Sequence, residues 1–325
     1  MRAVLCETWG PPESLVIKDM ATPAPEAGEV LVRTRFAALN FLDTLIIENK
    51  YQVKPNLPFS PCGEFSGYVE ALGPGVTGFQ PGDAVAGFIG YGAAREMVIC
   101  PASQMIKVPA GLSLEKAAGL FVTYGTTMHA FRQRARLRAG ETLAVLGATG
   151  GVGLAAVELG HSLGARVIAC ASSAEKLEFA RKAGADEVVD YATSDLKEAL
   201  KTLTGGKGVD VVYDPVGGQL TEAALRALAW EGRLLVIGFA AGEIPRIPLN
   251  LALLKGCDIQ GVFWGDFVRR SPALQAENMR DIAAMAADGR ISAHIHRILP
   301  LENIAEALNI LKRREALGKV VLAMP

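Results

Sequence analysis

The chain has 325 residues, enough for two domains of ordinary size that each bury a core of their own. Its 33 Lys and Arg residues balance 34 Asp and Glu residues, which argues against the basic surface that drives general binding to nucleic acid or acidic membranes. Half of the residues are hydrophobic, but the longest uncharged run, residues 142–157, is interrupted by glycines and is too short to span a bilayer. We therefore expect a soluble protein that binds neither membranes nor nucleic acid.

The cysteines and the first residues indicate a cytoplasmic location. The cysteines are odd in number, far apart and free of CxxC pairs, as expected for reduced thiols: Cys6, Cys62, Cys100, Cys170 and Cys257. The sequence begins MRAVLCETWGPPE, which lacks the apolar stretch of a signal peptide. We expect no disulfide framework and no secretion.

Up to about Val108 the pattern is one of short strands separated by turns rich in proline and glycine. This punctuation is typical of a β-rich barrel or sandwich. The expected strands are Arg2 to Leu5, Leu15 to Lys18, Glu29 to Ala38, Glu64 to Ala71, Ala84 to Phe88 and Glu96 to Cys100.

From Ser113 onward the periodicity changes, and from Thr142 strands alternate with helices as in a doubly wound parallel α/β sheet. Six strands form the expected Rossmann set: Thr142 to Leu146, Arg166 to Cys170, Glu187 to Asp190, Val209 to Asp214, Arg233 to Ile237 and Asp258 to Val262. Beyond them we predict helices over 273–288 and 303–314, and strands over 294–299 and 319–322 that return to the first domain.

A glycine-rich turn joins the first Rossmann strand to the helix expected over residues 151–163. The segment TLAVLGATGGVG, residues 142–153, matches the GxGxxG dinucleotide fingerprint with Ala148 in the first position. Small residues permit the tight turn, Gly150 lets the backbone approach a pyrophosphate, and Gly153 lets the helix pack on the strand. The strand before it and the helix after it favour a phosphate-binding turn over an ordinary glycine-rich one.

The end of the second Rossmann strand indicates which nicotinamide cofactor binds. NAD-specific sites usually place an acidic residue there, roughly 20 residues past the glycines, to hold the ribose hydroxyls. Here the sequence reads CASS, and no carboxylate precedes Glu175. Ser172 and Ser173 offer hydroxyl donors and Lys176 a cation for a 2′-phosphate, so we predict NADP(H). The alternative is that Ser173 only caps the next helix.

Short segments along essentially the whole chain also carry a family resemblance, among them AALNFLD (37–43), PCGEFSG (61–67), TYGTTMHA (123–130), YDPVGG (213–218) and GKVVL (318–322). They resemble the medium-chain dehydrogenase/reductase superfamily, and within it the zinc-free NADPH:quinone oxidoreductases that include zeta-crystallin. The resemblance implies a GroES-like catalytic domain over residues 1–122, a Rossmann NADP-binding domain over 123–262, and a C-terminal return to the catalytic domain over 263–325.

The resemblance also indicates whether the chain has the ligands for zinc. Zinc-dependent alcohol dehydrogenases of the superfamily hold catalytic zinc through Cys and His ligands and structural zinc through four close cysteines. This chain has Asn40 where the first cysteine ligand would stand and Gly63 where the histidine would stand, and it lacks the cysteine cluster. Zinc needs three or four ligands in register, so we expect no metal site.

Carried over position by position, the resemblance implies a set of catalytic and cofactor-binding residues. Those expected in the cleft beside the nicotinamide, and proposed as catalytic, are Asn40, Asp43 and Tyr51. Those expected on the cofactor are Asn40, Thr126, Gly150, Gly151, Val152, Ser172, Ser173, Lys176, Tyr191, Phe239, Val262, Trp264 and Lys319. The alternatives are that Asn40 and Asp43 cap a helix, that Tyr51 is a loop aromatic and that Phe239 belongs to the core.

We expect NADPH-dependent hydride transfer to a quinone, with Tyr51 or Asn40 donating a hydrogen bond to the developing oxyanion. Reduction of enones, 2-alkenals or acryloyl thioesters needs the same cofactor, and the aromatic segment GVFWGDF (261–267) would suit either substrate class. An alternative of another class is a crystallin-like or RNA-binding protein that retains NADPH binding. The apolar strand CDIQGV (257–262) is expected at a sheet edge, where pairing with its copy would give a homodimer.

Overall fold

The computed structural model describes all residues, 1–325, and they form two compact units. The N-terminal unit comprises residues 1–122, 269–289 and 293–325, and the Rossmann unit comprises residues 123–268 and 290–292. Residues 263–268, which the sequence assigns to the C-terminal return, stay with the Rossmann unit because Phe267 stacks on His129 there, with ring centroids 3.8 Å apart. None of the helices combines the length and the apolarity needed to cross a bilayer.

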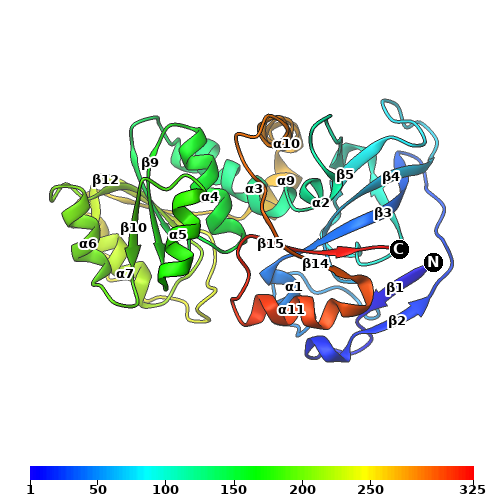
Figure 1. Ribbon diagram of the computed structural model, residues 1–325, viewed down its shortest axis with the longest axis horizontal. Helices are drawn as coiled ribbons and strands as arrows, with labels where there is room; N and C mark the ends of the chain where they lie inside the picture. Colours follow the sequence, from blue (N-terminus) through cyan, green and yellow to red (C-terminus); the bar gives the residue numbers. More distant parts are fainter. The chain divides into compact units, whose positions relative to one another are not determined.

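The N-terminal unit is built on a mainly antiparallel sheet. Its strand order is β14-β15-β3-β4-β5-β7, with β6 pairing with β3. The bounds are β3 Glu29–Leu39, β4 Glu64–Leu72, β5 Ala84–Phe88, β6 Met97–Pro101, β7 Met105–Lys107, β14 Ile295–Pro300 and β15 Lys319–Ala323 (Figure 1). A separate hairpin pairs β1 (Arg2–Leu5) with β2 (Val16–Asp19). The strands expected from alternation in the first half are confirmed, and β7 is an addition.

The long strand β3 organises this sheet because it has different partners along its length. Residues 29–33 pair with β6, residues 36–39 pair with β15, and β4 follows the opposite side. The pairing with β4 shifts register between Leu31 and Val32 and again between Thr34 and Phe36. Such bulges bend a strand and increase its twist, which lets one strand serve two sets of neighbours.

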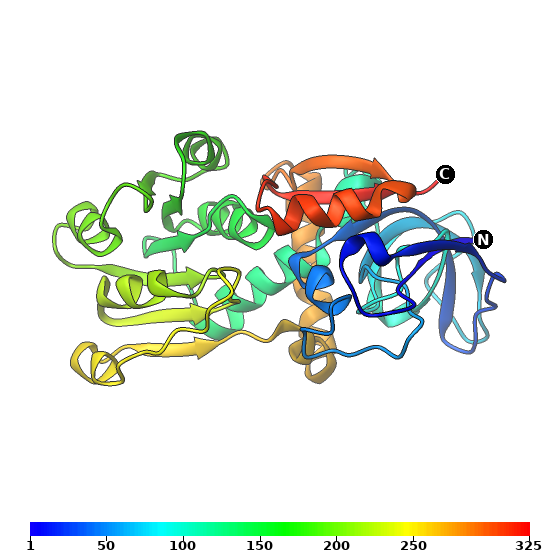
Figure 2. The same cartoon turned by 90° about the horizontal axis from the view of Figure 1, so that it is seen from below.

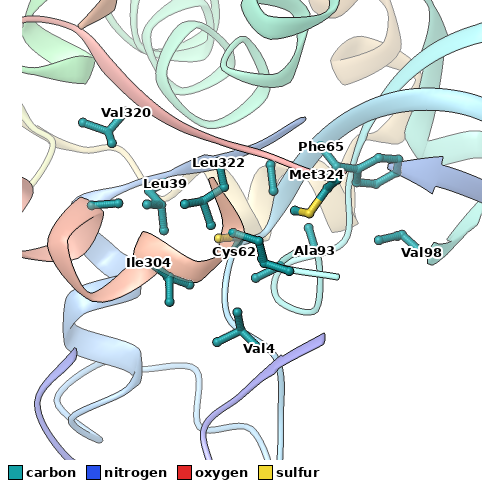
Figure 3. Packing of buried hydrophobic residues seen from close by; sticks show 14 of the residues in the cluster. Val4, Leu39, Cys62, Phe65, Ala93, Val98, Ile304, Val320, Leu322 and Met324 are labelled. Carbon is teal, nitrogen blue, oxygen red and sulfur yellow. The ribbon is translucent and has the colours of Figure 1, made fainter. Parts of the chain in front are cut away.

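Apolar side chains from distant parts of the chain close the core of the N-terminal unit. Figure 3 shows Val4, Leu39, Phe65, Ile304 and Leu322 converging in this core. Helix α11 (Ile304–Lys312) packs along β15 and against α1 (Phe41–Ile46), as Figure 2 shows for α11 and the C-terminal strands. Two further helices of this unit are α2 (Leu114–Ala118) and α10 (Pro272–Ala287).

The Rossmann unit holds a six-stranded, wholly parallel sheet in the order β10-β9-β8-β11-β12-β13, with the doubly wound order expected of such folds. The strands are β8 Thr142–Leu146, β9 Arg166–Ala171, β10 Glu187–Asp190, β11 Val209–Asp214, β12 Leu228–Val236 and β13 Asp258–Gly261. All six strands expected from the sequence are confirmed. Because every strand runs the same way, the loops after them gather at one edge of the sheet.

Helices connect these parallel strands. Helix α4 (Gly151–Ser162) and helix α5 (Ala174–Lys182) both pack on β9 (Figure 1). The other helices are α3 Phe121–His129, α6 Leu196–Leu203, α7 Gln219–Arg226, α8 Asn250–Lys255 and α9 Trp264–Arg270, and a π-helical turn spans Ala130–Ala135. Right-handed crossovers place α4 and α5 on one face of the sheet and α7 and α8 on the other, because the strand order reverses after β10.

The tripeptide 290–292 belongs to the Rossmann unit through one buried carboxylate. Glu158, on α4, accepts a hydrogen bond from the Tyr124 hydroxyl at 2.8 Å and from the Ser292 backbone N–H at 3.0 Å, and a further one from the Ser292 hydroxyl. The carboxylate therefore fixes the returning chain to the second unit before it continues into β14.

Candidate active site

A buried ion pair lies at the centre of the candidate site in the N-terminal unit. The Lys319 ammonium, at the start of β15, donates to the Glu64 Oε1 and to the Asn40 Oδ1, both at 2.6 Å. Its third hydrogen bond goes to the backbone carbonyl of Leu39 at 2.9 Å. An ammonium has three donors, and all three are engaged.

Gly119 and the backbone of Val122 accommodate this buried pair. Glu64 is fully buried and Lys319 is 4% exposed. The other Glu64 oxygen accepts the Val122 backbone N–H at 2.9 Å, in the first turn of α3. The aliphatic stem of Lys319 lies on Gly119, where a Cβ would come within 3.1 Å of it. Burial of two charges is tolerated here because both are paired and hydrogen-bonded.

Asn40 is held in one orientation by this pair. Its Nδ2 donates to Glu64 Oε1 at 2.8 Å while its Oδ1 accepts from Lys319. The amide nitrogen carries two N–H groups, so one donor remains beyond the hydrogen bond to Glu64. Asn40 is also the residue before helix α1. The alternative of a simple capping role is incomplete, because the side-chain oxygen is bound by Lys319.

Asp43 follows Asn40 by three residues, and its carboxylate accepts hydrogen bonds from two backbone N–H groups. One carboxylate oxygen accepts the Asn40 N–H at 2.7 Å, and the other accepts the Cys62 N–H at 3.2 Å. Burial raises the pKa of Asp43 to about 7, against the opposing effect of these N–H donors and of Lys319. Asp43 also forms a capping box with Asn40 at the start of α1, as the capping alternative expects. The catalytic role expected for Asp43 stays a prediction.

Tyr51 lies in the loop after α1 and is close enough to Asp43 for their charges to interact. Burial, and secondarily the charge of Asp43, raise the pKa of the Tyr51 phenol, so the hydroxyl keeps its proton at neutral pH. The phenol is half-buried and packs against the core of the unit. A neutral hydroxyl in this place is a hydrogen-bond donor.

Two residues of this cluster bear on the predicted site. The ammonium of Lys319 uses its three donors within the unit, and the cofactor contact expected for this residue stays a prediction. Glu64 is absent from the residues expected at the site, although it bonds both Asn40 and Lys319. The available signal was an acidic residue at the start of an apolar strand, in the segment PCGEFSG.

The glycine-rich turn in the Rossmann unit has the form that the fingerprint predicts. The strand β8 ends at Leu146, Gly147 takes φ of +58°, and α4 begins at Gly151. A Cβ on Gly153 would lie 2.1 Å from the carbonyl oxygen of Gly147, so only glycine fits where helix and turn meet. The left-handed turn residue is thus Gly147, one place before Ala148, and Ala148 itself is fully buried.

Gly150 differs from Gly153 in what surrounds it. A Cβ there would meet nothing nearer than the Gly147 carbonyl oxygen at 3.7 Å, and its φ of −71° suits any residue. The open space borders the first turn of α4, whose N–H groups have no intrahelical acceptors. A methyl group added at Gly150 would fill this space at the N-terminus of α4. Such a space fits the pyrophosphate of a dinucleotide.

The residues expected at the 2′-phosphate follow the neighbouring strands β9 and β10. Ser172 is exposed directly after β9, and Ser173 caps α5, its Oγ accepting the Lys176 backbone N–H at 3.4 Å. The cap uses the oxygen and leaves the hydroxyl hydrogen to donate. Tyr191 follows β10, and its backbone N–H bonds the Ala171 carbonyl at 3.1 Å, which places it beside the end of β9.

The residues expected near the nicotinamide follow β12 and β13 or lie on α3. Phe239 is exposed in the loop after β12, and the Val262 N–H bonds the last residue of β12 at 3.1 Å. Trp264 is buried, with its indole 3.0 Å from the place a Gly125 Cβ would occupy, next to Thr126 on α3. Phe267 of the segment 261–267 stacks on His129, so that aromatic is part of the packing.

Comparisons with known proteins agree with both units. Residues 26–110 match the alcohol dehydrogenase GroES-like domain, and residues 151–280 match the family model described as zinc-binding dehydrogenase. Quinone oxidoreductase-like protein 2 of Bos taurus is 38% identical over 325 residues, covering 99% of this chain and 92% of the relative. The chain belongs to the quinone oxidoreductase family of the medium-chain dehydrogenases/reductases.

Solved members of this superfamily have the same fold. Escherichia coli quinone oxidoreductase, crystallised in complex with NADPH, has a TM-score of 0.93 at 29% identity, covering 99% of this chain and 100% of that chain. An NAD-dependent alcohol dehydrogenase also has a TM-score of 0.93, at 32% identity with full coverage of both chains. The predicted fold class, a parallel Rossmann sheet with a GroES-like domain, is therefore confirmed.

The side chains around Asn40 do not make the donor set of a zinc site. Across the chain no three His, Cys, Asp or Glu side chains cluster so that they could hold a metal ion. At the place where the family's zinc-dependent members would have ligands, the ammonium of Lys319 lies among the Asn40 and Glu64 oxygens. A cation supplied by the chain itself already occupies the acceptors that a metal would need.

Proposed function

We propose that this protein reduces quinones with NADPH, without zinc. The observation that carries the proposal is that the Rossmann unit holds a glycine cradle fitted to a dinucleotide, while the N-terminal unit holds a cluster with two neutral hydrogen-bond donors, Asn40 and Tyr51. The family and its NADPH-complexed solved member support the cofactor. Bound NADPH would supply a hydride, and a quinone accepts one without prior activation by a Lewis acid.

In this proposal the chain's own residues hold the reactants and stabilise charge. Gly151 and Val152 bind the pyrophosphate through backbone N–H groups, and Gly150, whose own N–H bonds the Gly147 carbonyl at 3.2 Å, lets the pyrophosphate approach. The remaining N–H of Asn40 and the hydroxyl of Tyr51 donate to the acceptor oxygen that gains negative charge during hydride transfer. Tyr51 is also the group from which a proton can pass to that oxygen, so that one hydride and one proton together give the hydroquinone.

The remaining buried groups act by positioning. Lys319 and Glu64 hold the Asn40 amide so that its free N–H keeps one direction, and Asp43 holds the backbone of Asn40 and Cys62. A donor that is already oriented costs no reorganisation when the oxyanion forms.

A direct assay tests this function. NADPH oxidation should be driven by 1,4-benzoquinone or 9,10-phenanthrenequinone, should persist after treatment with a chelator, and should occur in protein whose zinc content is far below one per chain. Enones, 2-alkenals and acryloyl thioesters serve as competing acceptors in the same assay. Faster turnover of any of these, or activity lost with a stoichiometric zinc, would contradict the proposal.

Cofactor choice gives a second expected result. Lys176→Ala should raise the KM for NADPH about tenfold, the equivalent of one charge-assisted hydrogen bond of about 1.4 kcal/mol, and leave the KM for NADH nearly unchanged. The matched control is Lys182→Ala on the same helix, where the side chain is exposed and pairs loosely with Glu178 at 3.8 Å. Equal losses with both cofactors would show that Lys176 does not meet the 2′-phosphate.

We also infer a homodimer formed through the Rossmann sheet. The strand β13 is an edge strand, as expected from the sequence, and pairs only with β12. Nearby on helix α8 and just before it, Leu249, Leu253 and Leu254 are 76%, 79% and 68% exposed. An open strand edge beside exposed leucines is a typical self-association surface, and two-fold pairing closes it.

Replacing Leu254 with glutamate should therefore convert a dimer into a monomer at micromolar concentration, measured by light scattering, without lowering the melting temperature. Leu274→Glu, at an exposed leucine on α10 in the other unit, should leave the dimer intact. A monomeric wild-type protein, or a dimer that survives Leu254→Glu, would place the contact elsewhere or remove it.

We propose a reducing location such as the cytoplasm. All five cysteines are free and buried, and burial raises the pKa of Cys62, Cys100 and Cys170. Thiols protected in this way are typical of proteins that form no disulfides.

A further inference from the structure

Arg95 is a cation without an anionic partner. It lies just before β6 in the N-terminal unit, its Nε is buried with no hydrogen-bond partner, and no carboxylate pairs with its guanidinium. Burial lowers the pKa of Arg95, and no neighbouring charge opposes that effect. The residue as a whole is only partly buried, so its terminal N–H groups remain available to a ligand, while the buried Nε has no partner within the chain.

The guanidinium borders an open cavity of about 420 Å³. The other walls combine apolar and polar residues, and none of them is acidic: Ile89, Tyr91, Ile99, Pro101 and Gln104. Gly92 forms the remaining wall, and a Cβ there would lie 2.8 Å from Arg95 Nη2, so the absence of a side chain leaves the guanidinium its place. The size is within the range of small-molecule sites.

The cavity wall is held firmly. Tyr91 packs edge-on against Phe59, with ring centroids 5.9 Å apart. The loop that carries Tyr91 and Gly92 is fixed by three backbone hydrogen bonds to residues 61–63, from Ile89, Ala93 and Ala94, at 2.8, 2.9 and 3.0 Å. An aromatic and two isoleucines therefore line the same space as the Arg95 guanidinium.

We propose that this cavity binds a small carboxylate carried on an aromatic or apolar body. The planar guanidinium matches a carboxylate with two parallel hydrogen bonds, while Ile89, Ile99 and the ring of Tyr91 offer apolar contacts to the rest of the ligand. A single cation suits a monoanion, because Arg95 is the only charged side chain among the lining residues and a phosphate dianion would keep one charge uncompensated. The lining residues of the cavity do not include any residue of the Asn40 cluster, and the proposal does not depend on the reaction proposed above.

The test uses 2-naphthoate as the probe and 2-naphthamide as its neutral counterpart, titrated calorimetrically in the presence and absence of NADP⁺. Wild type should bind one naphthoate per chain in both conditions and bind naphthamide far more weakly. Arg95→Gln should weaken naphthoate binding at least tenfold and leave the naphthamide titration unchanged. The matched control is Arg33→Gln, at an exposed arginine paired with Glu70, and it should behave as wild type.

Folding is followed in the same samples. Arg95→Gln removes a partly buried charge that has no partner, so its melting temperature should equal or exceed that of wild type. A second variant, Ile99→Trp, fills the cavity while keeping the guanidinium and should also abolish naphthoate binding. The proposal is overturned by wild type that does not bind naphthoate at millimolar concentration, by binding that NADP⁺ displaces, or by binding that survives both substitutions.

Discussion

Replacing Lys319 with methionine should lower the free energy of unfolding by about 3–5 kcal/mol, because it leaves the Glu64 carboxylate buried without its cation. The side chain of Lys319 is nearly inaccessible, and its three hydrogen bonds all end within the N-terminal unit. Urea titration followed by circular dichroism measures the change. The double variant Lys319→Met, Glu64→Gln should recover a substantial part of the loss, since it removes the stranded charge as well.

The control for this prediction is Lys312→Met, which breaks a surface pair with Glu48 and should cost about 0–1 kcal/mol. The activity of Lys319→Met, assayed where the protein is still folded, should fall through kcat because Asn40 loses its fixed orientation. If Lys319→Met unfolds like wild type but binds NADPH more weakly, Lys319 contacts the cofactor, as the sequence suggests.

The two glycines of the phosphate cradle should respond to alanine in opposite ways. Gly150→Ala should fold as stably as wild type, because its backbone suits alanine and its surroundings are open. The added methyl would occupy the space expected for the pyrophosphate, so NADPH should bind at least about tenfold more weakly, a cost of about 1.4 kcal/mol.

Gly153→Ala should instead destabilise the Rossmann unit by about 2 kcal/mol or more, since the new methyl meets the Gly147 carbonyl at 2.1 Å and the backbone must move. Thermal unfolding and fluorescence titration with NADPH separate the two outcomes. If Gly150→Ala binds NADPH as wild type does, the cofactor does not approach the turn at this residue.

The strands could be predicted because both halves of the sequence carry local patterns that agree with the final packing. The Rossmann strands 142–146, 187–190 and 209–214 have the bounds that periodicity predicts. The strand β12 begins at Leu228, five residues before the expected start at Arg233, because β11 pairs with it from Val209 across a register shift. Apolar periodicity does not report such irregular pairing.

The candidate site was less accessible to sequence reasoning, because its central contacts join residues far apart in the chain. Lys319 and Asn40 are 279 residues apart, and Lys319 and Glu64 are 255 apart. Nothing local distinguishes a lysine that enters a buried ion pair from one that binds a phosphate. The glycine turn was easier, since strand, turn and helix are adjacent in sequence and each has its own signature.

Because β3 pairs with β15, the last strand of the chain, the sheet of the N-terminal unit can be completed only at the end of synthesis. Residues 36–39 form hydrogen bonds with the last strand of the chain, and Lys319 reaches back across 280 residues to Leu39. At about 5–20 residues per second, a ribosome needs tens of seconds to make the intervening chain. During that time the edge of β3 and the carboxylate of Glu64 lack their partners, because β15 and Lys319 have not been synthesised. The Rossmann strands can already pair. The N-terminal unit is thus begun first and completed last, and its apolar open edge is the part of the nascent chain that most needs protection from aggregation.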